Sequence, residues 1–303
     1  MFQKMNDEFA EYCVEQLLEI GSTWDQIVLN PNITWKIIQD HPDKPWDYKL
    51  LSSSPNITWE IVQANPGKPW NYYFLGLNPN ITWEIVQANL DKPWNYISLS
   101  ENSNITWKIV QDNPDKPWDY YHLSKNTNIT WDIVKANFCE EWDYHWLTGN
   151  PNITFDIINS NPCEDWHWDC VDNPNINWEI VQANPDADWD YTTLSVNLNI
   201  TWDIIDAHPD KNWDYNCLSS KSNITWEIIQ ANPTKHWDYD EVSMNPNLTF
   251  KIIKENPNIN WHNLHIHENT FEVEKNNFFR KKLQEQFKRS ELKKELIAST
   301  KKC

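Results

Sequence analysis

Apolar and polar residues recur along this chain in short blocks with a period of 24 residues. In residues 80–89 the apolar side chains are spaced as on one face of a helix, with Thr82 placed to cap it and Glu84 in its first turn. A proline follows most of these blocks and stops the helix. A second apolar block begins at Trp94 and is short enough for 3₁₀ character. Each unit is therefore predicted to be a pair of short helices.

Tryptophans hold two fixed places in every unit, and we expect their rings to form the core. Helices shorter than about 12 residues are marginal in water, so these units must gain stability by stacking. The first series is Trp35, Trp59, Trp83, Trp107, Trp131, Phe155, Trp178, Trp202, Trp226 and Phe250. The second series, which has no substitution, is Trp46, Trp70, Trp94, Trp118, Trp142, Trp166, Trp189, Trp213, Trp237 and Trp261.

This pattern predicts an all-α fold: a right- or left-handed α-solenoid, or superhelix, of short α/3₁₀ helix pairs in about ten 24-residue repeats. Units stacked about 8–10 Å apart would form a curved rod on the order of 90 Å long. Residues 1–21 are predicted to form an N-terminal capping helix, and residues 22–270 the repeats. Residues 271–303 form a basic C-terminal tail, which either caps the last repeat as a helix or reaches a partner, another copy or a membrane surface.

The repeated string resembles two families. Its 24-residue period and Asn-Pro punctuation are similar to the leucine-rich repeat variant, in which an α-helix pairs with a 3₁₀ helix in a right-handed superhelix. Tryptophan stands here at two positions per unit where that family has small residues or proline. Over residues 22–266 the chain resembles more closely the tryptophan-rich tandem-repeat proteins of giant DNA viruses of the mimivirus group, a likeness that implies no particular activity.

The charge is unevenly distributed. Of the net charge of −19, residues 1–270 carry 39 acidic and 15 basic side chains, whereas residues 271–303 carry 5 and 10. So acidic a body repels phosphates, which argues against nucleic acid and favours a basic protein as the partner. The basic tail also allows self-association.

No signal peptide and no membrane-spanning run is evident, so we expect an intracellular, non-secreted protein, in the host cytoplasm or virion if it is viral. Asn-x-Thr occurs at Asn32, Asn56, Asn80, Asn104, Asn128, Asn152, Asn199, Asn223 and Asn247, and we interpret it as a turn before a helix cap rather than a glycosylation signal.

Comparison among the repeats separates framework positions from variable ones. The second residue after the second-series tryptophan is nearly always Tyr and the fifth is Leu or Val, whereas the third and fourth vary freely. These two positions should line one strip along the solenoid. Its aromatic middle is a candidate binding site, made of Tyr73, Phe74, Tyr121, His122, His145 and Trp146. Drift of unused surface would produce the same variation.

A candidate acidic patch precedes the same tryptophans in repeats five to seven. Its residues are Glu140, Glu141, Asp143, Glu164, Asp165, Asp186 and Asp188, several of them in place of the Asp-Lys-Pro of earlier units. We interpret the patch as a docking point for a basic partner; a solvated face would look the same.

Chemistry-bearing motifs are scarce. His262, His265 and His267 could hold zinc but lack a Cys or carboxylate at motif spacing. The cysteines have no metal-binding or redox spacing, so we expect reduced thiols, no metal and no cofactor. The sequence therefore favours a non-enzymatic protein–protein interaction scaffold, with a structural or assembly component of a virion or viral factory as the alternative. An enzyme is a third possibility, and His262, His265 and His267 are the only residues that would support it.

Overall fold

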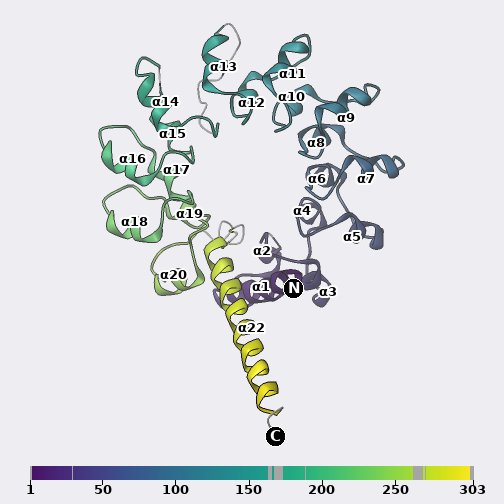
Figure 1. The fold of residues 1–303 in the computed structure, drawn as a ribbon, viewed down its shortest axis with the longest axis vertical. Helices are drawn as coiled ribbons and strands as arrows, with labels where there is room; N and C mark the ends of the chain where they lie inside the picture. Colours follow the sequence, from purple (N-terminus) through teal and green to yellow (C-terminus); the bar gives the residue numbers. More distant parts are fainter. Residues whose placement is uncertain are drawn as a thin grey trace.

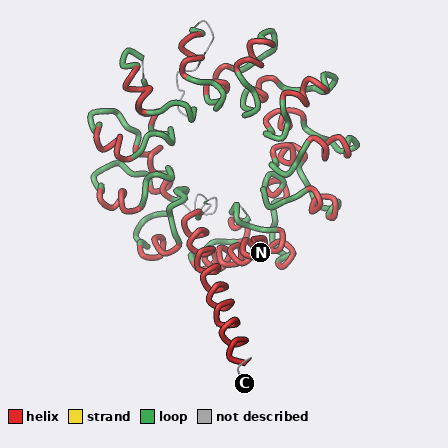
Figure 2. The backbone as a smooth tube through the Cα atoms, viewed as in Figure 1, coloured by secondary structure: helices red, strands yellow, loops and turns green. Residues whose placement is uncertain are grey.

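The repeats are arranged around a ring. A computed structural model describes residues 2–28, 30–162, 166, 173–187, 189–261, 269 and 271–300. Figure 1 shows successive helix pairs following one another around a central opening, with the first and last units side by side, and Figure 2 shows the loops between them. The described part of the chain is helical with no strand. The solenoid is thus confirmed, and the expected curved rod is closed into a ring, because the curvature brings its two ends together.

Where both halves of a unit are described, one helix lies on the outer side of the ring and one on the inner side (Figure 1). The outer helices are α3 (Trp35–Asp40), α5 (Trp59–Ala64), α7 (Trp83–Ala88), α9 (Trp107–Asp112), α11 (Trp131–Ala136), α13 (Phe155–Ser160), α14 (Trp178–Ala183), α16 (Trp202–Ala207), α18 (Trp226–Ala231) and α20 (Phe250–Glu255). The inner helices are α2 (Trp24–Ile27), α4 (Tyr48–Leu51), α6 (Tyr72–Leu77), α8 (Tyr96–Glu101), α10 (Tyr120–Leu123), α12 (Tyr144–Thr148), α15 (Tyr191–Leu194), α17 (Tyr215–Ser219) and α19 (Tyr239–Val242). The inner helices are short α-helices, and the 3₁₀ character expected for them is not seen in the described residues.

Indole rings pack from one unit to the next. The ring centroid of Trp94 lies 5.3 Å from that of Trp59 and 5.2 Å from that of Tyr72, both in the preceding unit. The Trp94 and Tyr72 rings meet edge-on. The same contacts recur around the ring, from Trp35 against Trp70 to Trp226 against Trp261. The tryptophans predicted as core are buried or half-buried, which confirms that stacked aromatic rings hold the units together.

The two tryptophan series differ in their hydrogen bonds. The indole N–H of Trp94 donates to the Asn89 carbonyl at 2.9 Å, and every other second-series tryptophan bonds the carbonyl five residues earlier in the same way. The indole N–H of Trp59 in the first series is buried without a partner. Phenylalanine has no N–H, so it can replace a first-series tryptophan, as Phe155 and Phe250 do, but not a second-series one without losing this bond.

A ladder of buried asparagines runs around the ring. The Asn102 amide donates to the carbonyls of Gly76, Asn78 and Ile81 in the preceding unit, at 2.7, 3.1 and 3.4 Å, while its oxygen accepts from the Asn104 N–H. The ladder position falls at residues 30, 54, 78, 102, 126, 150, 173, 197, 221, 245 and 269, which are asparagines except for a serine at 54 and a lysine at 221. These amides satisfy backbone groups that the short helices leave unpaired.

The Asn-x-Thr asparagines also bond backwards. Asn80 and Asn104 each donate to two carbonyls of the unit before. Their interpretation as turn formers is therefore incomplete, because these side chains also link consecutive repeats. The motif recurs because each joint between units needs an amide donor there.

One ladder position holds a lysine. Lys221 is 5% exposed, and its Nζ donates to the carbonyls of Asn197 and Ile200 at 2.7 and 2.8 Å. Burial lowers the pKa of Lys221 to about 8. A lysine side chain has no oxygen, so it cannot accept the backbone N–H bond that the asparagine oxygen accepts at other ladder positions. The Oδ1 of nearby Asn223 is also buried without a partner. This joint therefore lacks the acceptor that an asparagine side chain provides at other ladder positions.

Two terminal helices close the ring. α1 (Phe2–Glu19) packs against both α3 and α22 (Glu272–Thr300). The Asn30 amide donates to the Asn269 carbonyl at 3.3 Å, repeating across the seam the bond that links consecutive ladder residues elsewhere. Phe9 is fully buried beside Phe278 and Phe279 of α22. The first and last units therefore contact each other as neighbours.

Only the first part of α22 takes part in this closure. Phe271, directly before α22, adopts φ 48°, a left-handed conformation uncommon for an aromatic residue. Its ring stacks on that of Phe250 with the centroids 4.2 Å apart. α22 then leaves the ring, and its second half extends away from it (Figure 1). We call residues 284–300 the arm. Among the described residues, no helix combines the length and apolar character needed to cross a membrane.

Candidate functional site

The variable strip lies on the inner helices, and the helix geometry sets its direction. In the inner helices the Tyr, Leu and Ser positions, such as Tyr96, Leu99 and Ser100, face the core or the next unit, except that Tyr239 of α19 is 37% exposed. At 100° per residue, the two variable positions between Tyr and Leu fall on the opposite side. Because these helices form the inner side of the ring (Figure 1), that side faces the central opening. We call this surface the inner wall.

The predicted aromatic residues all lie on the inner wall. Tyr73, Tyr121, His145 and Trp146 are exposed, and Phe74 and His122 are half-buried. The two residues of each helix contact each other, with ring centroids 5.3 Å apart for Tyr73–Phe74 and 5.2 Å for the other two pairs. The six residues thus come from α6, α10 and α12, and their role in binding stays a prediction.

Two further apolar residues belong to this surface. Leu50 of α4 and Ile97 of α8 are 37% and 41% exposed at the same variable positions. Leu50 and Ile97 are not aromatic and so are not among the predicted site residues, although they occupy the same variable positions of the repeat. With them, five consecutive inner helices from α4 to α12 present exposed apolar side chains. We call this part of the inner wall the apolar arc.

Lysines lie over two of the rings in the apolar arc. Lys49 lies 5.4 Å from the centroid of Phe74, and Lys125 lies 3.9 Å from that of Trp146. Lys125 also pairs with Glu101 at 3.7 Å. These contacts hold Phe74 and Trp146 in place beside their exposed neighbours.

The remaining described part of the inner wall is polar. α15, α17 and α19 place Thr192, Thr193, Asn216, Cys217, Asp240 and Glu241 at the same positions. We call this the polar arc. Asp240 is exposed and Glu241 half-buried, whereas the Cys217 thiol donates to Asp214 at 3.3 Å. Burial first, and then that carboxylate, raise the pKa of Cys217 to about 11, so its thiol is poorly reactive near neutral pH.

The acidic patch is only partly visible. Glu140, Glu141 and Asp186 are exposed in the loops that follow the outer helices, and Phe138 beside them is 75% exposed. Glu164, Asp165 and Asp188 lie outside the described residues. Asp143 has another role: its carboxylate caps α12 by accepting from the Trp146 N–H at 2.8 Å. Asp143 therefore also has a structural role, and its part in the acidic patch stays a prediction.

These loops normally carry a lysine placed over an aromatic ring. Lys68 and Lys211 lie 5.1 and 5.0 Å from the ring centroids of Tyr48 and Tyr191 in the preceding units. Lys44 and Lys235 make the same contact with Trp24 and Tyr215. In repeats five and seven the lysine position holds Glu140 and Ala187, so the chain's own cation is missing there.

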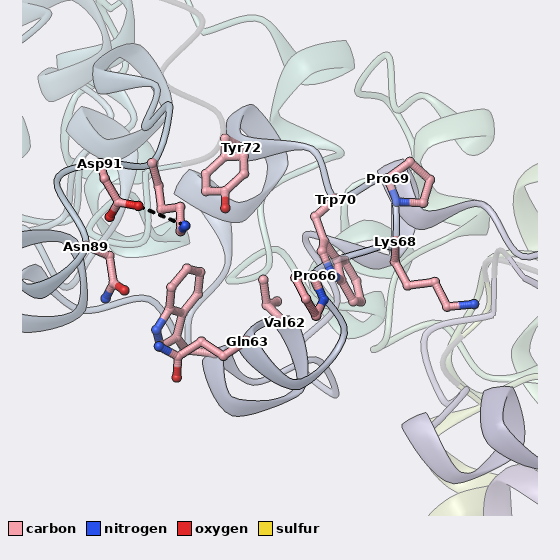
Figure 3. A pocket seen from close by; sticks show the side chains of 11 residues that line it. Val62, Gln63, Pro66, Lys68, Pro69, Trp70, Tyr72, Asn89 and Asp91 are labelled. Atoms are coloured by element: carbon pink, nitrogen blue, oxygen red, sulfur yellow. Dashed lines mark hydrogen bonds and ion pairs between the residues drawn. The ribbon is translucent and has the colours of Figure 1, made fainter.

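Grooves between consecutive units are shallow and open. Figure 3 shows one of about 430 Å³, with Val62 and Pro66 on one side, Tyr72 above and the Asp91–Lys92 pair of the next unit across from them. A larger hollow of about 600 Å³ lies beside Phe155, Pro185 and Ala187, where Phe replaces Trp and Ala replaces Lys. Smaller side chains at the joint between repeats six and seven therefore open the surface there.

Residues with metal or thiol chemistry are dispersed. The described residues contain no group of three or more His, Cys, Asp or Glu side chains that could hold a metal ion. The string His262, His265 and His267 lies outside the described residues, as do Cys163, Cys170 and Cys303. Cys13 is buried and free in α1, and Cys139 is exposed and free beside Glu140. Burial raises the pKa of the Cys13 thiol well above its usual range.

Comparison with known proteins adds no relative. No protein-family model, curated protein or solved structure matches the chain. The chain is a tandem-repeat protein of short tryptophan- and tyrosine-containing helices.

Proposed function

We propose that this protein is a non-enzymatic scaffold that binds a protein segment at the inner wall of its ring. One observation carries the proposal: the recurrent residues of the repeat pack the joints, whereas the variable positions of α4, α6, α8, α10 and α12 each include an exposed apolar side chain on the inner wall. Trp, Tyr, Leu and Asn pack the joints or satisfy backbone groups. The two variable positions instead hold a different pair of side chains in each unit, aromatic in α6, α10 and α12. Clustered exposed aromatic rings are typical anchors of protein interfaces.

The partner is proposed to be basic. The repeats carry a large excess of carboxylates, and the loops of repeats five and seven lack the lysine found over an aromatic ring elsewhere. A partner lysine or arginine would supply the missing cation beside Glu140 and Asp186. Both carboxylates are exposed and have no lysine next to them in the chain. A basic protein segment is therefore the chemistry that these loops favour over a nucleic acid.

A pair of variants tests the inner wall. Tyr121→Ser with Trp146→Ser removes two exposed rings from the apolar arc. Leu90→Ser with Leu198→Ser is the matched control, because these residues are also exposed but lie in loops outside the inner helices and outside the acidic patch. Partner proteins captured on the wild-type ring should be lost from the first variant and kept by the second. Capture that is unchanged by the first variant would exclude the inner wall as the binding surface.

The loops are tested separately by charge reversal. Glu140→Lys with Glu141→Lys should weaken capture of the same partners and reduce its sensitivity to salt, because opposite charges at an interface attract less when screened. Asp112→Lys with Asp132→Lys, on the outer helices, changes the net charge equally. Equal loss in both variants would mean that only net charge matters and would remove the loops as a specific contact.

A second candidate is a structural or assembly component of a virion or viral factory, within the giant-virus repeat family and inside the host cell. The observation that favours it is the arm, which comes from a basic region and extends from an acidic ring. Deleting residues 284–303 keeps Phe278 and Phe279 and so preserves closure. Light scattering at rising concentration should show oligomers of the intact chain and none of the variant that lacks the arm. A monomer at all concentrations would contradict this candidate.

A further inference from the structure

We propose that the joint between repeats six and seven binds one lysine side chain of the partner protein, at the place where other joints hold a lysine of this chain. The site is the hollow beside Phe155 and Ala187, and we call it the Ala187 groove. The inference rests on the proposed basic partner and specifies where one of its side chains binds. It does not depend on the inner wall, because α13, α14 and the loop after α14 form this groove.

The equivalent groove between repeats two and three shows how a lysine sits at such a joint. Lys92 of the loop pairs with Asp91 at 2.9 Å and lines the groove together with Tyr72 of the preceding unit (Figure 3). The same ion pair recurs in three other loops, as Asp43–Lys44 at 3.0 Å, Asp115–Lys116 at 2.9 Å and Asp210–Lys211 at 3.5 Å. A lysine at this position therefore has two partners, the carboxylate before it and an aromatic ring of the unit before.

The loop of the Ala187 groove keeps the backbone of the others. The Ala187 N–H donates to the Asn184 carbonyl at 3.1 Å, and the Trp189 N–H donates to the Ala187 carbonyl at 2.8 Å. The two corresponding bonds in the loop of Lys92 have the same lengths. A lysine at position 187 would thus start from the same backbone as Lys92. The hollow here measures about 600 Å³, against about 430 Å³ where Lys92 is present.

The charge and the surface of the groove suit an ammonium group on an apolar stem. Asp186 is exposed and corresponds to Asp91, but the residue after it is alanine, so the loop's own counter-ion is missing. An adjoining hollow of about 520 Å³ shares Phe155 with the groove and is also lined by Asp156 and Glu179. Among the described residues that line the two hollows, none is basic. A partner lysine can therefore pair with Asp186 while its methylene groups cover Phe155.

A short peptide provides the probe. We would titrate the intact ring with acetyl-glycyl-lysyl-glycine amide at low salt and follow the tryptophan indole N–H signals by nuclear magnetic resonance. The Trp189 indole donates to the carbonyl of Asn184, which lines the groove, at 2.9 Å. The Trp94 indole donates to Asn89 at 2.9 Å in a groove that holds its own lysine, and it serves as the internal control.

The Trp189 signal should shift on titration and the Trp94 signal should not. A peptide with norleucine in place of lysine has the same apolar stem without the ammonium group. It should bind at least about threefold more weakly, because it forms neither the ion pair nor the cation–π contact. Equal affinities of the two peptides, or no shift of Trp189 with either, would overturn the proposal.

Variants of the ring locate the peptide. Ala187→Lys fills the groove with a lysine of the chain itself and should abolish the Trp189 shift, while thermal unfolding shows a protein at least as stable as wild type. Lys92→Ala should open an equivalent groove, so that the Trp94 signal now responds. Asp186→Asn should weaken binding and flatten its salt dependence, and Asp210→Asn is the matched control in a loop that keeps its lysine. A Trp189 shift that persists unchanged in Ala187→Lys would place the peptide elsewhere and overturn the proposal.

Partner capture separates this inference from the proposed function. Ala187→Lys should reduce capture of the partner proteins, whereas Ala64→Lys, which adds the same charge at an exposed site of α5, should not. Capture lost in Tyr121→Ser with Trp146→Ser but kept in Ala187→Lys would overturn this inference and leave the inner wall as the binding surface. The opposite result would overturn the inner wall and support the Ala187 groove as the contact.

Discussion

The joint between two ordinary repeats and the seam where the ring closes solve the same packing problem with different residues. At the joint between α6 and α8, indole and phenol rings stack and the Asn102 amide bonds three carbonyls of the unit before. The joint is built from residues at most 35 positions apart. Its stability therefore comes from the repeat itself.

The seam keeps one element of the joint and replaces the rest. The ladder bond from Asn30 to Asn269 is present, but the tryptophan sandwich gives way to a cluster around Phe9, and Tyr12 donates to Glu274. Ion pairs cross the region as well, Lys254 with Glu19 at 2.7 Å and Lys282 with Glu8 at 2.8 Å. Closing the ring thus depends on helices outside the repeat pattern, which can be altered without touching a joint.

Phe9→Ala should have the largest effect, confined to the seam. Phe9 is fully buried between α1 and α22, and truncating such a residue costs about 3–5 kcal/mol. Because repeats depend mainly on their neighbours, the joints should survive and the ring should open. Small-angle X-ray scattering should show a larger radius of gyration with far-ultraviolet circular dichroism nearly unchanged. Leu18→Ala, at a 41% exposed site of α1, is the control, and an unchanged radius in Phe9→Ala would disprove a separable seam.

Asn102→Ala should weaken a joint by about 3 kcal/mol, because three buried carbonyls lose a donor and the Asn104 N–H loses its acceptor. Asn104→Ala removes a half-buried amide with two acceptors and should cost less. Urea unfolding followed by tryptophan fluorescence measures both. A smaller loss for Asn102→Ala than for Asn104→Ala would show that the ladder is not the stronger link.

Trp94→Phe should cost at least about 1 kcal/mol more than Trp83→Phe. Both changes remove a similar buried ring area, but Trp94 alone donates its N–H to a carbonyl, that of Asn89. Thermal unfolding of the two variants, each compared with wild type, measures the difference. Equal losses would mean that the unsubstituted second series needs another explanation.

Lys221→Asn should change the pH dependence of stability at one joint. The pKa of Lys221 in the folded protein is about 8, below its value of 10.5 as a free side chain, so the folded state binds fewer protons between these pH values. The penalty of burying the cation is complete below about pH 8, and stability rises as pH increases above it, by at most about 1.4 kcal/mol per unit. Urea unfolding at pH 7, 8 and 9 should show this slope in wild type and not in Lys221→Asn; parallel profiles would refute a buried charge.

The helix pairs and the tryptophan core could be predicted from the sequence because they depend on neighbours within one or two units. Thr82 and Trp83 mark a helix start wherever they recur, and two rings per unit demand burial. Closure could not be predicted in this way. It depends on a small rotation at each joint, summed over the whole chain, and on contacts such as that between Asn30 and Asn269, 239 positions apart.

The candidate site could be predicted in part, because the burial of each repeat position depends on residues within one or two units. Variation between repeats identified Tyr73, Tyr121 and Trp146 as lying off the core, and their exposure agrees. Which side of the solenoid they face depends on the direction of curvature, which the repeat does not encode in any single residue. Lys221 was missed because Ser-Lys-Ser in a loop looks like solvated surface, and only the alignment of its position with the ladder asparagines reveals its burial.

Circular closure also limits how this gene product can vary in length. An open array tolerates the gain or loss of a whole unit at its ends, since each unit touches only those beside it. In a ring with eleven ladder positions, every joint turns by about 33°, and one unit more or fewer would require each joint to turn by about 3° less or more. Duplication of a repeat unit, the usual route by which tandem arrays grow, would therefore either strain all the joints at once or prevent the ring from closing.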